Sequence, residues 1–211
     1  MKFEELMGIV GGEPVFHAAL LKVGNVTDAA LHLQLTRWTR AGKLVQLRRG
    51  VYALAPPFRR KEPHPFVIAN ALRRGAYVSL HSALAYHAMI PEAVPVVTSV
   101  TTRRSEHLHS STGRFVFRHV KATCFFGYEL VEVGPGQSAF VAAPEKALLD
   151  LVYLTPGADR RSYLLELRLQ NLEPIRLDVL EEFAARMGKP KVRRSVKILS
   201  ALRDEEDYED L

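Results

Sequence analysis

The chain has 211 residues, of which 47% are hydrophobic and 25% are charged, a composition typical of a globular protein that can bury a sizeable core. No run of about 18 apolar residues occurs and the first residues lack the basic start and apolar centre of a signal peptide, so the sequence excludes a conventional transmembrane helix and predicts a cytoplasmic protein. Residues 1–63 hold ten Lys and Arg against five Asp and Glu, out of a net charge of +6 for the whole chain; this excess indicates a polyanion-binding region or, as the alternative, a basic surface that aids solubility.

Three short helices are predicted first. Apolar residues recur at helical spacing over residues 3–10, and again from His17 to Lys22, where the run ends near Gly24 and Asn25. Thr27 is suited to cap a third helix, because its hydroxyl can accept an unpaired backbone N–H.

A β-hairpin is predicted directly after the third helix, which ends at Gly42. The β-rich runs 43–47 and 51–54 are joined through Arg48, Arg49 and Gly50, where the glycine supplies the positive φ that a tight turn often needs. Three helices followed by a hairpin predict an N-terminal winged helix-turn-helix over residues 1–55.

The third helix has two contrasting faces. At 100° per residue, Leu31, Leu35 and Trp38 share one stripe, which we expect to be buried. The opposite face carries groups that fork onto guanine, bond a base edge or contact phosphates, and a solvated charged face is the alternative interpretation. The predicted DNA-contacting residues of the helix, its cap and the hairpin are Thr27, His32, Thr36, Arg37, Arg40, Lys43, Arg48 and Arg49, with Leu33 on the same face.

A proline-rich stretch over residues 56–65 predicts an extended linker between two domains. Arg59, Arg60 and Lys61 within it add DNA-backbone contacts or simply keep the linker solvated. The overall fold class expected is α+β, with a mixed α/β C-terminal domain over residues 66–205.

The second domain is expected to combine an antiparallel sheet with C-terminal helices. Residues 95–140 are rich in Val, Phe, Thr and Tyr and predict the strands of the sheet. Pro144 suits the first turn of a helix that begins PEKALLD. The other expected helices cover residues 67–75, a segment ending before Pro91, and residues 161–171, 178–187 and 191–202. The acidic tail 206–211 is expected to be disordered.

A second basic patch lies near the C-terminus, where an amphipathic helix is expected to dock through Val192, Val196, Ile198 and Leu199. We take docking as the first interpretation and a nucleic-acid or partner surface as the alternative. The patch consists of Lys189, Lys191, Arg193, Arg194 and Lys197.

Patterns typical of catalysis are missing from the sequence. Five histidines fall between His81 and His119, but His81 and His87 lie on different helix faces, and His107 and His109 fall in a polar loop without a recognised ligand set. No Asp or Glu stands two positions before a Lys as in metal-dependent nucleases, and the chain holds no phosphate-binding glycine loop. Cys124 has apolar neighbours that favour a buried thiol. We therefore expect no enzyme activity, cofactor or metal.

Several strings in a fixed order resemble the AbiEi family of antitoxins from type IV toxin–antitoxin systems. After a hairpin ending LRRGVYAL come YVSLHSALAYHAMIPEAVP, VTSVTTRRSEHLHSSTGRFVFRHV, FFGY and AAPEKALLDLVYL. The resemblance covers most of the chain, from about Thr27 to Leu154, with a weaker echo in PKVRRSVKIL.

The resemblance implies a prokaryotic repressor that binds inverted repeats in its own promoter DNA and counteracts a nucleotidyltransferase toxin, in the context of phage defence by abortive infection. It assigns DNA contacts to Thr36, Arg37, Arg40, Arg48 and Arg49, and antitoxicity or a second DNA contact to Lys189, Arg193 and Arg194. For His81, Tyr86, Glu145 and Asp150, structural roles compete with a toxin-facing site. The alternative functions are a stand-alone winged-helix regulator, or a protein-interaction module that binds a partner mainly through its C-terminal domain.

Overall fold

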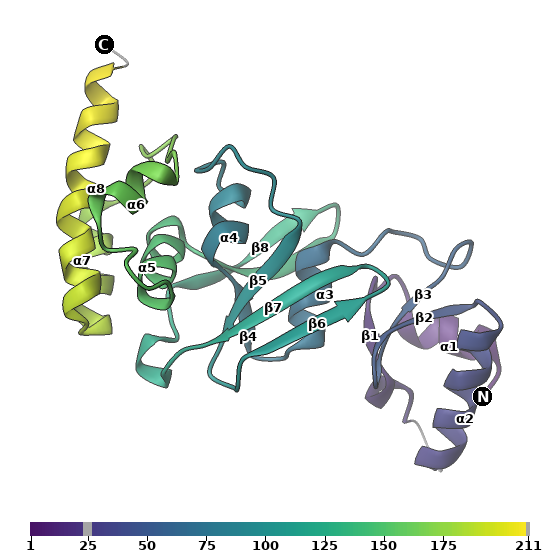
Figure 1. The fold of residues 1–211 in the computed structure, drawn as a ribbon. Coiled ribbons are helices and arrows are strands. Elements are labelled where there is room, and N and C mark those ends of the chain that lie inside the picture. Colours follow the sequence, from purple (N-terminus) through teal and green to yellow (C-terminus); the bar gives the residue numbers. More distant parts are fainter. Residues whose placement is uncertain (23–26, 210–211) are drawn as a thin grey trace. The chain divides into compact units, whose positions relative to one another are not determined.

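A computed structural model describes residues 1–22 and 27–209 as a mixed α/β protein (Figure 1). The chain forms two compact units. The first comprises Met1–Arg74 with the short segments His109–Gly113 and Glu132–Ala139, and the second comprises the remaining residues from Gly75 onward. Residues 67–74 of the helix expected to open the second domain lie in the first of these units.

The first unit begins with an alternation of helices and strands. The helices predicted at residues 3–10 and after Thr27 are confirmed as α1 (Phe3–Val10) and α2 (Asp28–Arg40). The second helical run is shorter than expected, because Phe16–His17 forms strand β1 and only Ala18–Leu21 continues as a 3₁₀ turn, η1. Its expected end at residues 24–25 lies outside the described residues.

The predicted hairpin is confirmed as β2 (Leu44–Arg48) and β3 (Val51–Leu54). Strand β1 adds to it, giving a three-stranded antiparallel sheet in the order β1-β3-β2. Helix α3 (Pro65–Leu72) follows, with Pro65 at its first turn. One apolar core joins α1, η1, α2 and the sheet, with Leu6, Leu21 and Leu35 at its centre.

A six-stranded sheet in the order β6-β7-β5-β4-β9-β8 organises the second part of the chain. Its strands are β4 (Ala76–Val78), β5 (Val96–Thr101), β6 (Glu106–Ser110), β7 (Gly113–His119), β8 (Tyr128–Gly134) and β9 (Gln137–Ala142). The antiparallel sheet expected over residues 95–140 is wrong for β5 with β7, which are parallel, while β4, outside that range, pairs antiparallel with β5 and parallel with β9. The sheet is mixed because β5 is parallel to β7 and β4 is parallel to β9, and β6 lies at its edge next to β7.

Helices complete the second unit. Helix α4 (Leu80–Tyr86) follows β4, and α5 (Pro144–Leu154) packs against α4, α7 (Leu177–Met187) and α8 (Pro190–Glu209). Helices α7 and α8 lie side by side (Figure 1).

Two of the expected C-terminal helix bounds differ from those observed. Helix α6 (Arg161–Glu166) is shorter than the predicted 161–171, because Arg168 and Asn171 adopt left-handed backbone conformations, with φ of 50° and 54°. The tail 206–211 was expected to be disordered, but helix α8 runs through it to Glu209, and its last two residues lie outside the described part of the chain. None of the helices described in the structure combines the length and apolar content needed to cross a membrane.

Candidate nucleic-acid interface

Helix α2 has well-defined ends. The hydroxyl of Thr27 accepts a hydrogen bond from the Ala30 N–H at 3.3 Å, so the predicted cap is confirmed. Asp28 in the first turn forms an ion pair with Lys22 at 2.6 Å. Gly42 follows the last turn with φ of +68°, a conformation that suits glycine at a helix end. Thr27, which was predicted to contact DNA, therefore serves as the cap of α2.

The buried face of α2 is the predicted one. Leu31, Leu35 and Trp38 are all buried, and the Trp38 ring meets the Phe3 ring of α1 edge to face with 5.5 Å between centroids. These contacts fix the rotation of α2 about its own axis, and with it the direction of the opposite face.

The opposite face of α2 is exposed along its length, as predicted. Its members are His32, Leu33, Thr36, Arg37 and Arg40. Leu33 is 53% exposed, and the Thr36 hydroxyl donates to the His32 carbonyl at 2.8 Å, leaving its oxygen free to accept. The face thus combines two guanidinium groups with an imidazole, a hydroxyl and one apolar side chain.

Lys43 was expected on this exposed face, but it is half-buried elsewhere. Its Nζ atom lies 4.7 Å from the centroid of the Phe3 ring and 5.9 Å from that of Phe58. These are cation–π distances, so the ammonium group stabilises the aromatic side of the core.

The two arginines of the hairpin tip have different surroundings. Gly50 occupies the turn with φ of +81°, as predicted, and Arg48 pairs with Val51 across it. The Arg48 side chain is half-buried and donates to the Leu72 carbonyl of α3 at 3.5 Å, whereas Arg49 is exposed. Arg49 is therefore the hairpin arginine best placed to meet an external ligand.

The proline-rich segment is bound to the first unit rather than extended in solvent. The buried Gln137 side chain accepts from the His64 N–H at 2.9 Å and donates to the Glu62 carbonyl at 3.0 Å. Lys61 donates to the Pro135 carbonyl at 2.7 Å, and Arg59 forms an ion pair with Glu62. Arg60 is exposed.

Some members of the second basic patch contact other parts of the fold, whereas others are exposed. Lys191 donates to the Thr155 carbonyl, and burial lowers the pKa of its ammonium group. Arg194 forms an ion pair with Asp159 at 2.7 Å. Arg193 and Lys197 are exposed and help to line a cavity of about 620 Å³ at the start of α8. The docking face of α8 is confirmed for Val192, Val196 and Leu199, which are buried, and Ile198 is half-buried.

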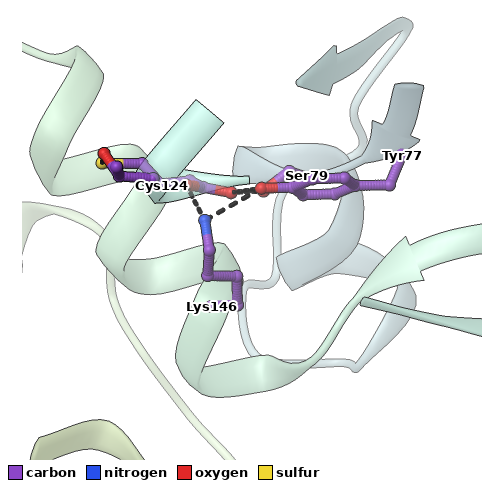
Figure 2. Close-up of polar contacts among 6 residues, drawn as sticks. Tyr77, Ser79, Cys124 and Lys146 are labelled. Carbon is purple, nitrogen blue, oxygen red and sulfur yellow. Dashed lines mark hydrogen bonds and ion pairs between the residues drawn. The ribbon is translucent and has the colours of Figure 1, made fainter. Parts of the chain in front are cut away.

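A buried polar cluster lies in the second unit, where Lys146 of α5 reaches toward Tyr77 of β4 (Figure 2). Lys146 donates to the Tyr77 hydroxyl at 2.9 Å and forms an ion pair with Asp150. The Tyr77 and Ser79 hydroxyls each donate to Asp150 at 2.8 Å. Both charged side chains have no exposed surface, so an external ligand cannot reach them without a rearrangement of the fold.

Burial and the ion pair act on Asp150 in opposite directions. Burial raises the pKa of its carboxyl group, and the Lys146 ammonium and the two hydroxyl donors oppose that rise. Burial, with the adjacent Asp150 charge, raises the pKa of the Tyr77 hydroxyl far above its usual range, so Tyr77 stays a hydrogen-bond donor. The sequence analysis named Asp150 as a candidate residue but did not name Lys146. The only feature of the sequence that could have indicated Lys146 is its four-residue spacing from Asp150.

Other residues singled out from the sequence have structural contacts. The buried Glu145 accepts from the Arg176 N–H at 2.9 Å, at the residue that caps α7, and Cys124 is buried as expected. His87 Nε2 donates to the Ala142 carbonyl at 2.8 Å. Burial lowers the pKa of the half-buried His81, and Tyr86 is 40% exposed.

The histidine pair expected in a polar loop instead lies on a strand. His107 and His109 are two positions apart on β6, so they lie on the same face of the strand, and both are exposed. Among the residues that the structure describes, no three His, Cys, Asp or Glu side chains gather as a metal site would require.

Comparison with known proteins bears on the fold. No family model and no curated protein matches this sequence. The crystal structure of the RV2827C protein from Mycobacterium tuberculosis is similar in fold, with a TM-score of 0.53 and 18% sequence identity over 93% of this chain and 75% of that one. At this identity the similarity establishes a shared fold and carries no function.

Proposed function

We propose that the protein is a DNA-binding transcriptional repressor in the cytoplasm and the antitoxin of a type IV, AbiE-like toxin–antitoxin system. In this proposal residues 1–55 are a winged helix-turn-helix, α2 enters the major groove as the recognition helix, and the β2–β3 hairpin is the wing. Arg49 at the hairpin tip contacts phosphates or an adjacent minor groove.

The exposed face of α2 is the observation that carries the DNA-binding part. The buried stripe fixes the rotation of α2, so the opposite face exposes one set of polar side chains together: His32, Thr36, Arg37 and Arg40. Side chains of these types can hydrogen-bond base edges and phosphates. The order α1, β1, η1, α2, β2, β3 further supports the winged-helix assignment, because a short helical turn precedes α2 and a hairpin follows it.

The antitoxin part rests on the resemblance of the ordered strings between Thr27 and Leu154 to AbiEi antitoxins. From that resemblance we take the inverted-repeat operator, the nucleotidyltransferase toxin and the role in phage defence. Within this proposal, the exposed Arg193 and Lys197 are the members of the second basic patch available for antitoxicity or for a further DNA contact.

Two single substitutions test the DNA interface on the operator upstream of the gene. Arg37→Ala should weaken binding by about 1–3 kcal/mol and relax the base preference at one position, since a forked guanidinium–guanine contact is lost. Arg49→Ala should weaken binding to all sequences. It should also lower the slope of log affinity against log salt by about 0.9 in magnitude, the value for one lost phosphate contact.

Arg160→Ala is the matched control, because it removes an exposed arginine of the second unit. It should bind like the unmodified chain. Unchanged operator affinity in both the Arg37 and Arg49 variants would contradict the proposed interface. The toxin assignment is tested separately by co-expression with the product of the adjacent gene: relief of growth arrest supports it, and persistent arrest opposes it.

A further inference from the structure

The loop between β5 and β6 exposes two adjacent arginines at one end of the six-stranded sheet. Arg103 and Arg104 are both exposed, and so is Lys121, two residues after the end of β7. These residues all belong to the second unit, outside the helix and hairpin described above.

Hydrogen bonds hold the backbone of this loop in place. The Arg103 N–H donates to the buried Thr101 hydroxyl at 3.2 Å, and the His119 N–H donates to the Ser105 hydroxyl at 3.0 Å. The His119 ring donates from Nδ1 to the Arg103 carbonyl at 3.1 Å. The loop is therefore tied to β5 on one side and to β7 on the other, so a ligand need not order its backbone.

The three cations have no ion-pair partner among the side chains that the structure describes. Over residues 1–22 and 27–204, no ion pair links Arg103, Arg104 or Lys121 to a carboxylate. Arg118 on β7 provides the contrast, because its guanidinium donates to the Leu154 carbonyl at 3.0 Å and serves the packing of the unit.

We infer that Arg103 and Arg104 form a second DNA contact, which binds phosphates of a duplex without reading its bases. Guanidinium groups bond phosphate oxygens in a forked geometry, and two adjacent arginines on one loop offer two such groups to a phosphate backbone. Base reading is not expected, since a loop at a sheet end does not offer the helix or ribbon that fits a major groove. The inference deepens the proposed function and rests on it for the identity of the polyanion.

Salt dependence of binding by the full chain tests this inference. Affinity is measured by fluorescence anisotropy on the operator duplex and on a random-sequence duplex of equal length, over a range of salt concentrations. The Arg103→Ala/Arg104→Ala variant should bind both duplexes more weakly by the same factor. Its slope of log affinity against log salt should fall in magnitude by about 1.8, since each lost phosphate contact accounts for about 0.9.

Two further variants isolate the effect of the loop. Arg103→Lys/Arg104→Lys keeps the charge and should keep the slope, whereas Arg160→Ala/Arg161→Ala removes the same charge from the start of α6 and should leave the slope unchanged. Circular dichroism confirms that each variant is folded. An unchanged slope in the alanine double variant, or an equal loss in the α6 control, would overturn the inference.

The same measurements separate this inference from the proposed function. If Arg37→Ala loses operator affinity while the loop variant keeps its slope, only the second contact is wrong. If the loop variant loses slope while Arg37→Ala and Arg49→Ala bind normally, the loop contact stands and the α2 interface is wrong.

Discussion

At the scale of single residues, the least expected feature is the fully buried pair of Lys146 and Asp150. Two charges four residues apart on a helix are more often an exposed pair, and nothing in PEKALLD separates the two cases. The contacts of this pair come from distant parts of the chain, Tyr77 of β4, Ser79 just after it and Phe126 before β8, and such contacts are long-range information. The buried stripe of α2 was predictable because it depends only on helical periodicity.

Lys146→Met should lower the free energy of unfolding by about 3–5 kcal/mol, because Asp150 would remain buried without its cation. Chemical denaturation measures the loss. Lys197→Met, at an exposed lysine, is the control and should change stability by less than about 0.5 kcal/mol. A similarly small loss in the Lys146 variant would show that the pair is not needed for the fold.

His64 should make stability depend on pH. Its Nδ1 atom accepts the Phe66 N–H at the start of α3, and burial lowers the pKa of its imidazole. The unfolded chain, with a pKa of about 6.5, therefore binds a proton more readily, so the stabilisation is present above that pH and is lost as the pH falls through the lower folded value.

The His64→Asn variant keeps a capping side chain that does not titrate. Thermal unfolding between about pH 7 and pH 5 should show the native chain losing stability relative to this variant. Parallel pH profiles of the two proteins would contradict the role assigned to His64.

At the scale of elements, local sequence signals predicted α1, α2, α5, α7 and the β2–β3 hairpin. Strand β6 was missed because EHLHS is polar, and it lies at a sheet edge where only one side is paired. The parallel pairs were missed because strand order depends on contacts between distant segments, which periodicity does not encode.

The cap of α2 gives a prediction at this scale. Thr27→Ala should destabilise the first unit by about 1 kcal/mol, since the Ala30 N–H loses its acceptor, whereas Thr27→Ser keeps the oxygen and should be close to neutral. Urea denaturation compares the two variants. If the two variants were equally stable, the cap formed by Thr27 would not contribute to stability.

At the scale of the whole molecule, composition predicted two regions and a proline-rich segment between them. It did not predict that the segment is bound by Gln137, because that contact joins residues more than 70 positions apart. Within the candidate interface, the exposed face of α2 was predictable, but the internal contacts of Lys43 and Arg48 were not, since their partners come from other elements.

Gln137→Ala should loosen the segment around Glu62 and His64. Loss of both side-chain hydrogen bonds should speed hydrogen exchange at the His64 amide by roughly tenfold or more and increase tryptic cleavage after Arg60. Ser138→Ala, at the exposed neighbouring position of β9, is the control and should leave both measurements unchanged. Unaltered exchange in the Gln137 variant would contradict this role.

The most direct test of DNA recognition is the binding of the full chain to the duplex upstream of its own gene. Fluorescence anisotropy at physiological salt compares that duplex with a shuffled duplex of equal length and composition. We predict that the upstream duplex binds tighter by about 10³-fold or more, as specific DNA-binding proteins do. Equal affinity for the two duplexes, or binding to neither, would contradict the proposed function.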